Sequence, residues 1–347
     1  MIIKKDRIPI THIIFIGIFP SSIKKIIYKL KGYFIGKKVK IGFGSVIIGD
    51  KVNIGEGTKI GFLSVIRAKN IDIGRFVFIG SLTFMDAEQI VIGEDTRIRE
   101  QVYVGGIQNP DSLLKIGKRC LIMQMTYINP TKTVILGDDS AIGGHSLLFT
   151  HSSWLSQLEG YPVKFGPIKI GKKVWLPFRT FITSDVEIGD EVIVAPSCVI
   201  TRNIPSKSMA YGDPLKILPN IYAKPVSDER KINIINEVFR NFLDYLKYHG
   251  FNIEDVEQDS YRLIQVKGRK KIHKIVVSDK LEFKSESIKL INTLLLIDSE
   301  FDEKEKILKK CEMVLSLKNM KRYGSSDIGE ELIRYFSRYG IRFSRLD

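Results

Sequence analysis

IGDKVNIGEGTKIG, residues 48–61, contains three Ile-Gly dipeptides spaced six residues apart. The dipeptide recurs at 41, 73, 79, 92, 116, 142, 170 and 188, and the recurring intervals are six, thirteen and eighteen residues. A period of six does not fit the 3.6 residues of a helical turn, but it fits a short strand with one inward aliphatic residue, followed by a turn. Three such units close one triangular coil, and stacked coils bury a continuous aliphatic column. We therefore predict a mainly β protein with a parallel β-helix over about 39–205.

The rest of the 347-residue chain lacks this period and divides around the repeat. We expect an apolar and basic arm over 1–38, the β-helix domain over 39–222 and a C-terminal α+β domain over 223–347. In the last domain, helical spacing covers 235–246 and Gly250 follows as a stop. Short strands are expected at 262–267, 274–278 and 293–298, and further helices near 303–317 and 327–339. The sequence does not choose between an acceptor, a partner protein and another copy as the ligand of this domain.

The arm carries most of the net charge. The chain has 54 Lys and Arg against 39 Asp and Glu, a net charge of +15. Residues 1–40 hold ten of these basic residues and one acid. A nucleic-acid binder usually shows a basic stripe on its folded domain, so a charge confined to one arm argues against that class. Three scattered cysteines, Cys120, Cys198 and Cys311, suit neither a disulfide scaffold nor a zinc site, and they predict a reducing compartment, the cytoplasm.

The arm also has a helical pattern. The apolar run 8–19 is too short to span a bilayer, and it shows no obvious signal-peptide cleavage site. After Pro20, a basic amphipathic helix is expected, with a hydroxyl cap at its start, Gly32 at its end and an apolar stripe of Ile23, Ile26, Ile27 and Leu30. Two interpretations stay open. The helix contacts the inner face of an anionic membrane peripherally, or it caps the open end of the β-helix.

The segment 148–218 resembles a known family. It reads LFTHSSWLSQLEGYPVKFGPIKIGKKVW from 148, VITRNIP from 199 and YGDPLK from 211. The order and spacing of these elements are similar to those of hexapeptide-repeat acyltransferases, most closely galactoside- and maltose-type O-acetyltransferases and their polysaccharide-modifying relatives. The resemblance implies a left-handed β-helix, acetyl-CoA as cosubstrate, a sugar or glycan acceptor and a homotrimer with active sites between subunits.

Two of the five histidines, His145 and His151, lie inside the repeat. His151 begins the non-repeating stretch 151–167 and matches the family's general base, and a neutral imidazole can take the proton of an attacking sugar hydroxyl. His145 is the second candidate for the base or lines the acceptor site; otherwise it is a residue at the outer corner of a coil. A backbone carbonyl, Glu159 or Asp139 would orient the ring of His151. A zinc site like that of γ-class carbonic anhydrases would need a third histidine, so we expect no metal.

The resemblance also implies coenzyme contacts, although the chain departs from the family pattern at several of them. It reads Trp-Leu-Pro-Phe at 175–178, where relatives carry Trp-Ile-Gly and a small residue, but the backbone N–H of Phe178 could still bind an oxyanion. Pro196-Ser197-Cys198 stand where relatives usually carry Ala-Gly-Ser, and Arg202 replaces a common lysine. The predicted coenzyme contacts are Trp175, Phe178, Pro196, Thr201, Arg202 and Lys216; alternatively, the last three occupy only a solvated coil corner.

The non-repeating stretch would select the acceptor. Aromatic rings can stack on a sugar and polar side chains can bond its hydroxyls, and the candidates are Ser152, Trp154, Glu159 and Tyr161. The alternative is that Trp154 and Tyr161 pin the stretch to a neighbouring subunit. The expected function is acetyl-CoA-dependent O-acetylation of a surface polysaccharide or its precursor. N-acetylation of an amino sugar or an antibiotic, and a non-enzymatic scaffold at a membrane, are the alternatives.

Overall fold

The computed structural model describes residues 9–221, 223–258, 261–268, 271–279, 291–298 and 311–346. The chain forms two compact units, Met1–Lys224 and Pro225–Asp347. The sequence had placed this boundary at 222/223. The described part of the arm contributes buried side chains, Ile16, Tyr28 and Tyr33, to the core of the first unit.

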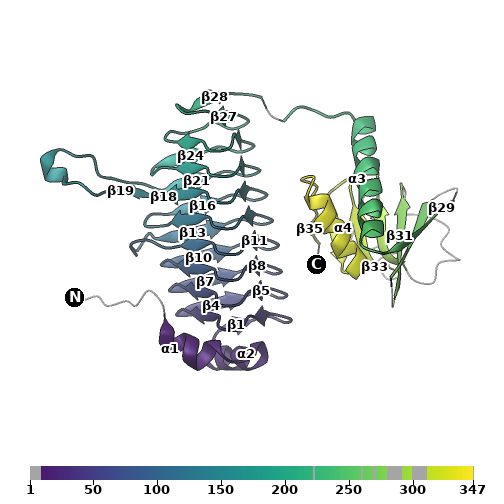
Figure 1. The fold of residues 1–347 in the computed structure, drawn as a ribbon, viewed down its shortest axis with the longest axis horizontal. Helices are drawn as coiled ribbons and strands as arrows, with labels where there is room; N and C mark the ends of the chain where they lie inside the picture. Colours follow the sequence, from purple (N-terminus) through teal and green to yellow (C-terminus); the bar gives the residue numbers. More distant parts are fainter. Residues whose placement is uncertain are drawn as a thin grey trace. The chain divides into compact units, whose positions relative to one another are not determined.

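Three parallel sheets form the sides of the first unit (Figure 1). Sheet A contains β1 (Phe34–Ile35), β4 (Lys51–Ile54), β7 (Asn70–Ile73), β10 (Gln89–Ile92), β13 (Leu113–Ile116), β16 (Val134–Leu136), β21 (Ile168–Ile170) and β24 (Val186–Ile188). Sheet B contains β2 (Lys40–Ile41), β5 (Lys59–Ile60), β8 (Phe78–Ile79), β11 (Arg97–Ile98), β14 (Leu121–Ile122), β17 (Ala141–Ile142), β22 (Trp175–Leu176), β25 (Ile193–Val194), β27 (Met209–Tyr211) and β28 (Lys216–Leu218), which turns back antiparallel on β27. Sheet C contains β3 (Val46–Ile48), β6 (Val65–Arg67), β9 (Phe84–Asp86), β12 (Tyr103–Val104), β15 (Tyr127–Asn129), β18 (Leu147–Phe149), β23 (Phe181–Ile182) and β26 (Val199–Ile200).

The chain visits the three sheets in turn, which confirms the predicted β-helix and is consistent with its left-handed form. The register explains the uneven period. In the lower coils Ile54 pairs with Ile73 and Ile60 with Ile79, so one coil takes 19 residues, whereas Ile170 pairs with Ile188 after 18. The extra residue lies between sheet C and sheet A, and it produces the intervals of thirteen.

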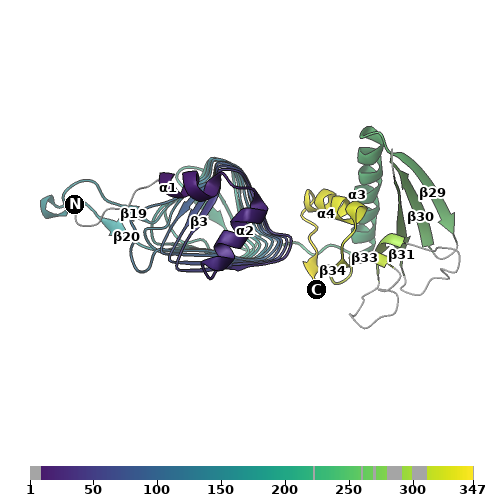
Figure 2. The same ribbon diagram turned by 90° about the horizontal axis from the view of Figure 1, so that it is seen from below.

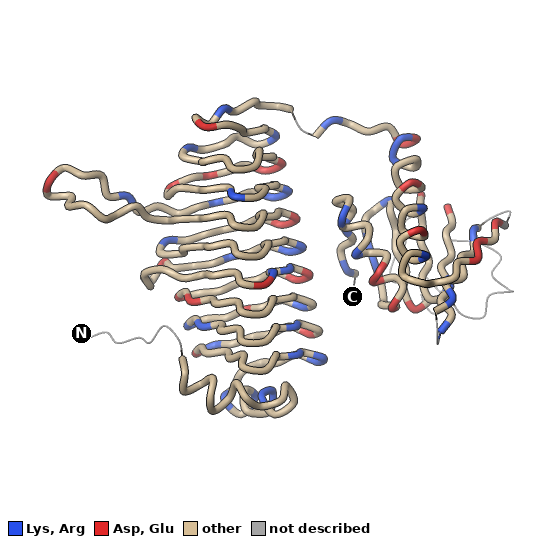
Figure 3. Tube along the Cα trace, viewed as in Figure 1, with Lys and Arg blue, Asp and Glu red and all other residues tan. Residues whose placement is uncertain are grey.

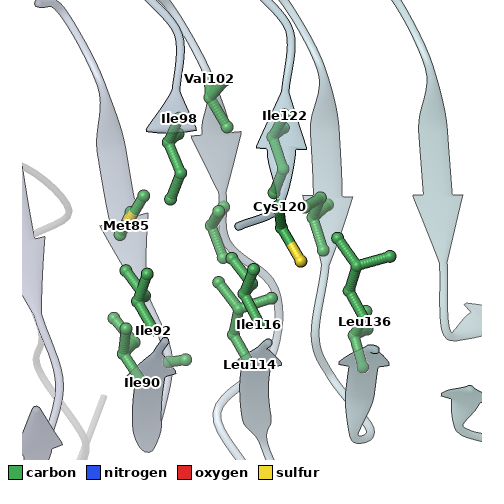
Figure 4. Close-up of a cluster of buried hydrophobic side chains, with 14 of the residues drawn as sticks. Met85, Ile90, Ile92, Ile98, Val102, Leu114, Ile116, Cys120, Ile122 and Leu136 are labelled. Carbon is green, nitrogen blue, oxygen red and sulfur yellow. The ribbon is translucent and has the colours of Figure 1, made fainter. Parts of the chain in front are cut away.

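The aliphatic residues of the repeat point inward and stack into one column (Figure 4). Ile54, Ile73 and Ile92 lie above one another in sheet A and are fully buried or nearly so. Each such side chain contributes roughly 1.5–3 kcal/mol through burial, so the column is the main source of stability. Cys120 lies in the same column, and burial raises the pKa of its thiol to about 11. It is therefore a packing residue and not a nucleophile.

Small hydroxyl residues connect the coils at the corner between sheets B and C. The hydroxyl of Ser45 donates to the carbonyl of Gly61 at 2.5 Å and accepts the N–H of Ser64 at 2.9 Å. Ser64 repeats this arrangement with Gly80 and Thr83 one coil further on. Because these corners are buried, their backbone groups need internal partners, and a short hydroxyl side chain supplies them.

The arm caps the first coil, as one of the two interpretations predicts, with the helices α1 (Ile10–His12), η1 (Ile13–Gly17) and α2 (Ser21–Leu30) lying over the open end (Figure 2). Of the predicted apolar stripe of α2, however, only Ile27 packs against the core in the described part of the chain. The buried residues are Lys24 and Tyr28, while Ile23, Ile26 and Leu30 are exposed and Ile27 is half-buried. The expected hydroxyl cap is also wrong. Ser21 does not cap α2 but accepts the N–H of Ile41 at 2.9 Å.

The reason for this orientation is the backbone of the first coil. A coil at the end of a stack presents backbone groups that no next coil can pair. Lys24 donates from Nζ to the carbonyls of Gly42 at 2.6 Å and Ser45 at 3.0 Å, and the Tyr28 hydroxyl accepts the N–H of Ile47 at 2.9 Å. Lys24 and Tyr28 of α2 therefore turn inward, and burial lowers the pKa of Lys24 to about 8.

The Tyr28→Phe variant should lose about 1–3 kcal/mol of unfolding free energy, because it leaves the buried N–H of Ile47 without an acceptor. We expect a lower urea midpoint by circular dichroism and faster hydrogen exchange of the Ile47 amide. Tyr161→Phe, at a side chain that is 45% exposed, is the control and should leave both unchanged. Equal exchange rates at Ile47 in the wild type and in Tyr28→Phe would show that this bond does not hold the cap.

The second unit is a mixed sheet with helices α3 (Asp228–Tyr248) and α4 (Asp327–Ser337) on one face. Its strands, in sheet order, are β29 (Asn252–Gln258), β30 (Tyr261–Lys267), β31 (Ile272–Ser278), β32 (Ile291–Leu296), β33 (Cys311–Ser316), β34 (Lys321–Gly324) and β35 (Ser344–Arg345). This confirms the α+β class and the three predicted strands. Gly250, with φ +81°, follows α3 as predicted.

The helix predicted near 303–317 is wrong over its described part. Residues 303–310 lie outside the described residues, and 311–316 form β33. In this strand Met313 and Leu315 pack into the cluster beneath the helices, while Cys311 and Val314 pack into a second cluster on the other face. A central strand buried on both faces is continuously apolar, so it carries no period of two that would separate it from a helix.

Candidate active site

A two-stranded ribbon interrupts the coil immediately after β18. The strands β19 (His151–Ser152) and β20 (Lys164–Phe165) pair antiparallel, with His151 opposite Phe165. Thr150 fixes the base of the ribbon. Its hydroxyl donates to the carbonyl of Asn129 at 2.7 Å, and its own carbonyl accepts the N–H of Gly166 at 3.0 Å. The chain thus leaves the β-helix at Thr150 and re-enters it at Gly166, and the ribbon projects from the β-helix (Figure 1).

His151 is the half-buried residue at the base of this ribbon. Its ring stacks on Phe165 with centroids 5.6 Å apart and an interplanar angle of 14°, and Phe149 lies 6.3 Å away. Its Nδ1 atom is buried and has no hydrogen-bond partner among the described residues. The aromatic stack therefore holds the imidazole plane.

Neither acidic residue considered as the orienting group of His151 takes that role. Asp139 is engaged elsewhere, since both of its oxygens accept hydrogen bonds from Arg119 at 2.7 and 2.6 Å. Glu159 lies in the short 3₁₀ turn η2 (Gln157–Glu159) and is exposed. The residues that sequence reasoning missed are Phe149 and Phe165. Their signal is the aromatic residue on each side of the non-repeating stretch.

The four predicted acceptor residues all lie on the ribbon and its tip. Ser152 belongs to β19, Glu159 to η2, and Trp154 and Tyr161 lie on either side of η2. All four are exposed, and Trp154 is 94% exposed. No hydrogen bond or ring contact in the described part of the chain joins any of them to His151. A tryptophan and a leucine (Leu158, 99%) so fully in solvent mark a contact surface, for a ligand or another chain.

The second predicted group lies on sheet B and at the corner between sheets B and C. Trp175 is in β22, Phe178 follows it in the turn, and Pro196 occupies the same turn position one coil later. The carbonyl of Phe178 accepts the N–H of Ser197 at 2.9 Å, which ties the two turns together. His145 lies at the same corner one coil earlier. It is exposed with φ +56°, and its ring centroid is 6.0 Å from that of Phe178. This is the outer-corner position considered for it.

The N–H of Phe178 has no acceptor within hydrogen-bonding distance in the described part of the chain. Its equivalent in a lower coil, Phe62, donates to the hydroxyl of Ser81 in the coil above. In the coil above Phe178 that position is Pro196, which has no hydroxyl. A side chain at Gly143 would meet the Phe178 nitrogen at 2.5 Å, so glycine is needed below this turn. The N–H of Phe178 is therefore free, as are those of Ser81, Glu100, Gln124 and Gly144 at the same position of other coils in the described part of the chain.

The third group, at the end of the β-helix, is partly engaged. Thr201 and Arg202 follow β26, and both are exposed. Arg202 donates from Nη2 to the carbonyl of Leu215 at 2.7 Å, which brings it next to Lys216 of β28. The structure therefore places the Arg202 guanidinium at the residue that precedes Lys216 in the chain. It also gives Arg202 a structural task, holding the β27–β28 hairpin.

These groups lie on two different edges of the β-helix, where an edge is the corner between two of its sheets. His151, the ribbon and Thr201–Arg202 lie at the corner that leads from sheet C to sheet A, whereas Phe178, Pro196 and His145 lie at the corner from sheet B to sheet C. The whole width of sheet C separates the two edges. One chain therefore does not bring the predicted base together with the predicted oxyanion donor.

Comparisons with known proteins agree with this fold. The chain resembles hexapeptide-repeat acetyltransferases. It is 35% identical over 77 residues to the Staphylococcus aureus (strain Mu50) protein named "Putative acetyltransferase SAV2555", covering 22% of this chain and 36% of that one. It is 25% identical over 119 residues to the Bacillus subtilis (strain 168) protein named "Putative acetyltransferase YvoF", covering 34% of this chain and 64% of that one. The chain thus spans about a third of the length of the first of these curated relatives. No protein-family model matches the chain.

Similar solved structures include two acetyltransferases. The hexapeptide-repeat acetyltransferase VCA0836 of Vibrio cholerae aligns over 61% of this chain and 88% of its own, with 17% identity and a TM-score of 0.30. The polysialic acid O-acetyltransferase OatWY aligns over 56% of this chain and 92% of its own, with 16% identity and a TM-score of 0.34. VCA0836 has also been solved in complex with acetyl coenzyme A. Across the described ranges, no group of three His, Cys, Asp or Glu side chains is placed to hold a metal ion.

Proposed function

We propose that this protein transfers an acetyl group from acetyl-CoA to a sugar hydroxyl of a surface polysaccharide or its precursor. The observation that carries the proposal is His151, half-buried and stacked on Phe165 where an exposed ribbon interrupts an otherwise regular coil. A scaffold needs no such interruption. The named relatives, which include acetyltransferases, support the reaction class. The buried free cysteines suit a reducing compartment, so we place the reaction in the cytoplasm.

In the proposed reaction, Nε2 of His151 accepts the proton of the sugar hydroxyl as the oxygen attacks the thioester carbonyl. The carbonyl oxygen becomes an oxyanion, to which the free N–H of Phe178 donates a hydrogen bond. The C–S bond then breaks, and the imidazolium returns its proton to the leaving thiolate, giving the acetyl ester and free CoA. Arg202 and Lys216 supply positive charge for the coenzyme phosphates, and Trp175 with Pro196 lines the pantetheine groove. Ser152, Trp154, Glu159 and Tyr161 contact the sugar.

The separation of the two edges supports a homotrimer as the active form. Because His151 and Phe178 lie at opposite borders of sheet C, the reaction needs the edge of one subunit that carries His151 and the edge of its neighbour that carries Phe178. Cyclic symmetry repeats this pairing at every interface, giving one complete site per subunit.

The reaction is tested with the full-length protein, acetyl-CoA and a panel of hydroxy sugars, amino sugars and capsular glycans. Free CoA is followed with a thiol reagent, and coenzyme binding by calorimetry. We expect acceptor-dependent thiol release with hydroxy sugars and their polymers. Thiol release with amino sugars alone would overturn O-acetylation. If no glycan gives thiol release and calorimetry detects no binding of CoA, the enzyme assignment is overturned.

The shared site predicts that two inactive variants restore each other. His151→Ala and Phe178→Pro damage different edges, so every trimer that contains both variants regains one intact site among its three interfaces. Co-expression with two different tags and tandem purification gives the mixed oligomer, and its thiol release should far exceed that of either variant alone. A mixed oligomer as inactive as its parents, with a trimer mass by light scattering, would place the whole site within one chain.

A further inference from the structure

The end of the β-helix that α1, η1 and α2 cover carries a large apolar surface. From α1 to β1, in the described residues 10–35, eight large apolar side chains are between 41% (Ile23) and 84% (Leu30) exposed. We call them the end face: Ile10, Ile14, Phe15, Ile18, Ile23, Ile26, Leu30 and Phe34. Single exposed apolar residues are ordinary, but a group of eight on adjoining elements marks a contact surface.

The end face cannot turn inward to hide these side chains. The inner side of α2 is already fixed by Lys24, whose ammonium donates to two carbonyls, and by Tyr28, which accepts the N–H of Ile47. With 3.6 residues per turn, Ile26 and Leu30 lie on the side of α2 opposite these two residues. The contacts that close the first coil therefore hold the apolar stripe in solvent.

The charge around the end face has one sign. Residues 9–40 contain seven lysines and no acidic residue. Lys29, Lys31, Lys38 and Lys40 are exposed, and among the described residues the one ion pair of these four, from Lys38 to Glu56, is long at 3.8 Å. Figure 3 shows the basic residues on α2 and on the turns of the adjoining coil. An apolar surface bordered by lysines complements an anionic bilayer, in which headgroups carry negative charge above an apolar layer.

We propose that the end face docks the protein onto an anionic lipid bilayer. The apolar side chains enter the boundary between headgroups and acyl chains, and the lysines contact the lipid phosphates. No single helix in the described ranges is long and apolar enough to span a membrane; Ile10–Gly17 and Ser21–Leu30 pass a test of length and composition together, but they are bent by 114°. A second copy of the chain fits less well, because a symmetric contact through this face would oppose lysine to lysine. The proposal goes beyond the acetyl transfer and does not depend on it.

The test is sedimentation of the full-length protein with vesicles of phosphatidylcholine, with and without phosphatidylglycerol. We expect binding to the anionic vesicles that weakens as salt is added, because surface charges are screened. The double variant Ile26→Ser/Leu30→Ser should lower the vesicle affinity at least about 10-fold, since it removes two exposed apolar groups without touching the core. The charge reversal Lys29→Glu/Lys31→Glu should lower binding to anionic vesicles only. Tyr248→Ser, at a side chain that is 87% exposed on α3, is the matched control.

Three outcomes would overturn the proposal. The wild type stays in the supernatant with anionic vesicles, or the Ile26/Leu30 double variant still binds like the wild type, or Tyr248→Ser weakens binding as much. Light scattering without lipid tests the alternative that a second copy of the chain binds the end face. Self-association that disappears in the double variant, without vesicle binding, would assign the end face to a second copy. Thiol release, measured with a soluble acceptor, should be the same in the wild type and the double variant. A failure of membrane docking can therefore be distinguished from a failure of the acetyl transfer.

Discussion

His151→Ala should lower turnover by about 100-fold or more, in line with the loss of a general base. The sugar hydroxyl is a weak nucleophile, and the acidic side chains around the ribbon are otherwise placed: Asp139 is engaged by Arg119, Asp185 pairs with Lys164 at 3.3 Å, and Glu159 lies on the exposed tip. Thiol release with saturating acceptor and acetyl-CoA measures the effect. Calorimetric affinity for CoA should change little, since the imidazole acts on the acceptor.

His145→Ala is the matched control for this experiment. His145 is exposed at an outer corner with a left-handed backbone, on the other edge of sheet C. Its replacement should leave turnover within a few-fold of the wild type. The opposite pattern, with His151→Ala active and His145→Ala inactive, would move the base to the edge that carries Phe178 and would remove the need for a neighbouring subunit. Circular dichroism of both variants checks the fold.

Phe178→Pro should lower turnover by about 10²–10³-fold, the usual effect of removing one oxyanion donor. Proline deletes the N–H together with the ring but keeps the backbone conformation, because the next residue, Arg179, has the left-handed φ of +58° that follows the corner position of a tight turn. The chain itself shows that proline fits. Pro196 occupies this position one coil later, before Ser197 with φ +60°. The effect should fall on turnover more than on the KM for acetyl-CoA.

Phe178→Ala separates the backbone from the side chain. It keeps the N–H and removes a ring that is 40% exposed, so its turnover should stay far above that of Phe178→Pro. If alanine and proline reduce turnover equally, the ring and not the amide matters, and the oxyanion donor lies elsewhere. Unchanged turnover in both variants would remove Phe178 from the site.

The repeat fold was predictable because its signal is redundant. Every coil repeats the same inward aliphatic residue, as Ile54, Ile73 and Ile92 do, so errors at single positions average out. The strand β33 was not predictable, because a segment buried on both faces carries no periodicity of its own. His151 could be singled out because it marks the place where the period stops. Its neighbour Phe165, fourteen residues away, is brought beside it only by the antiparallel ribbon.

The arm shows most clearly the difference between what was predictable from the sequence and what was not. Its sequence alone determined that a short amphipathic helix follows Pro20 and that the region is strongly basic. It could not determine which face turns inward, because apolar spacing assumes that the partner is an apolar core. The partner here is the unpaired backbone of the first coil, which needs hydrogen bonds, so Lys24 and Tyr28 are buried and Ile26 and Leu30 are not.

The sequence by itself determined the coil, its core residues and the candidate residues of the site, because each of these depends on local spacing and residue type. Only the tertiary structure decided that His151 and Phe178 occupy different edges and that the arm presents its apolar side to solvent. Both depend on how separate coils and helices satisfy one another's backbone groups. Those contacts join residues far apart in the chain, so no local pattern records them.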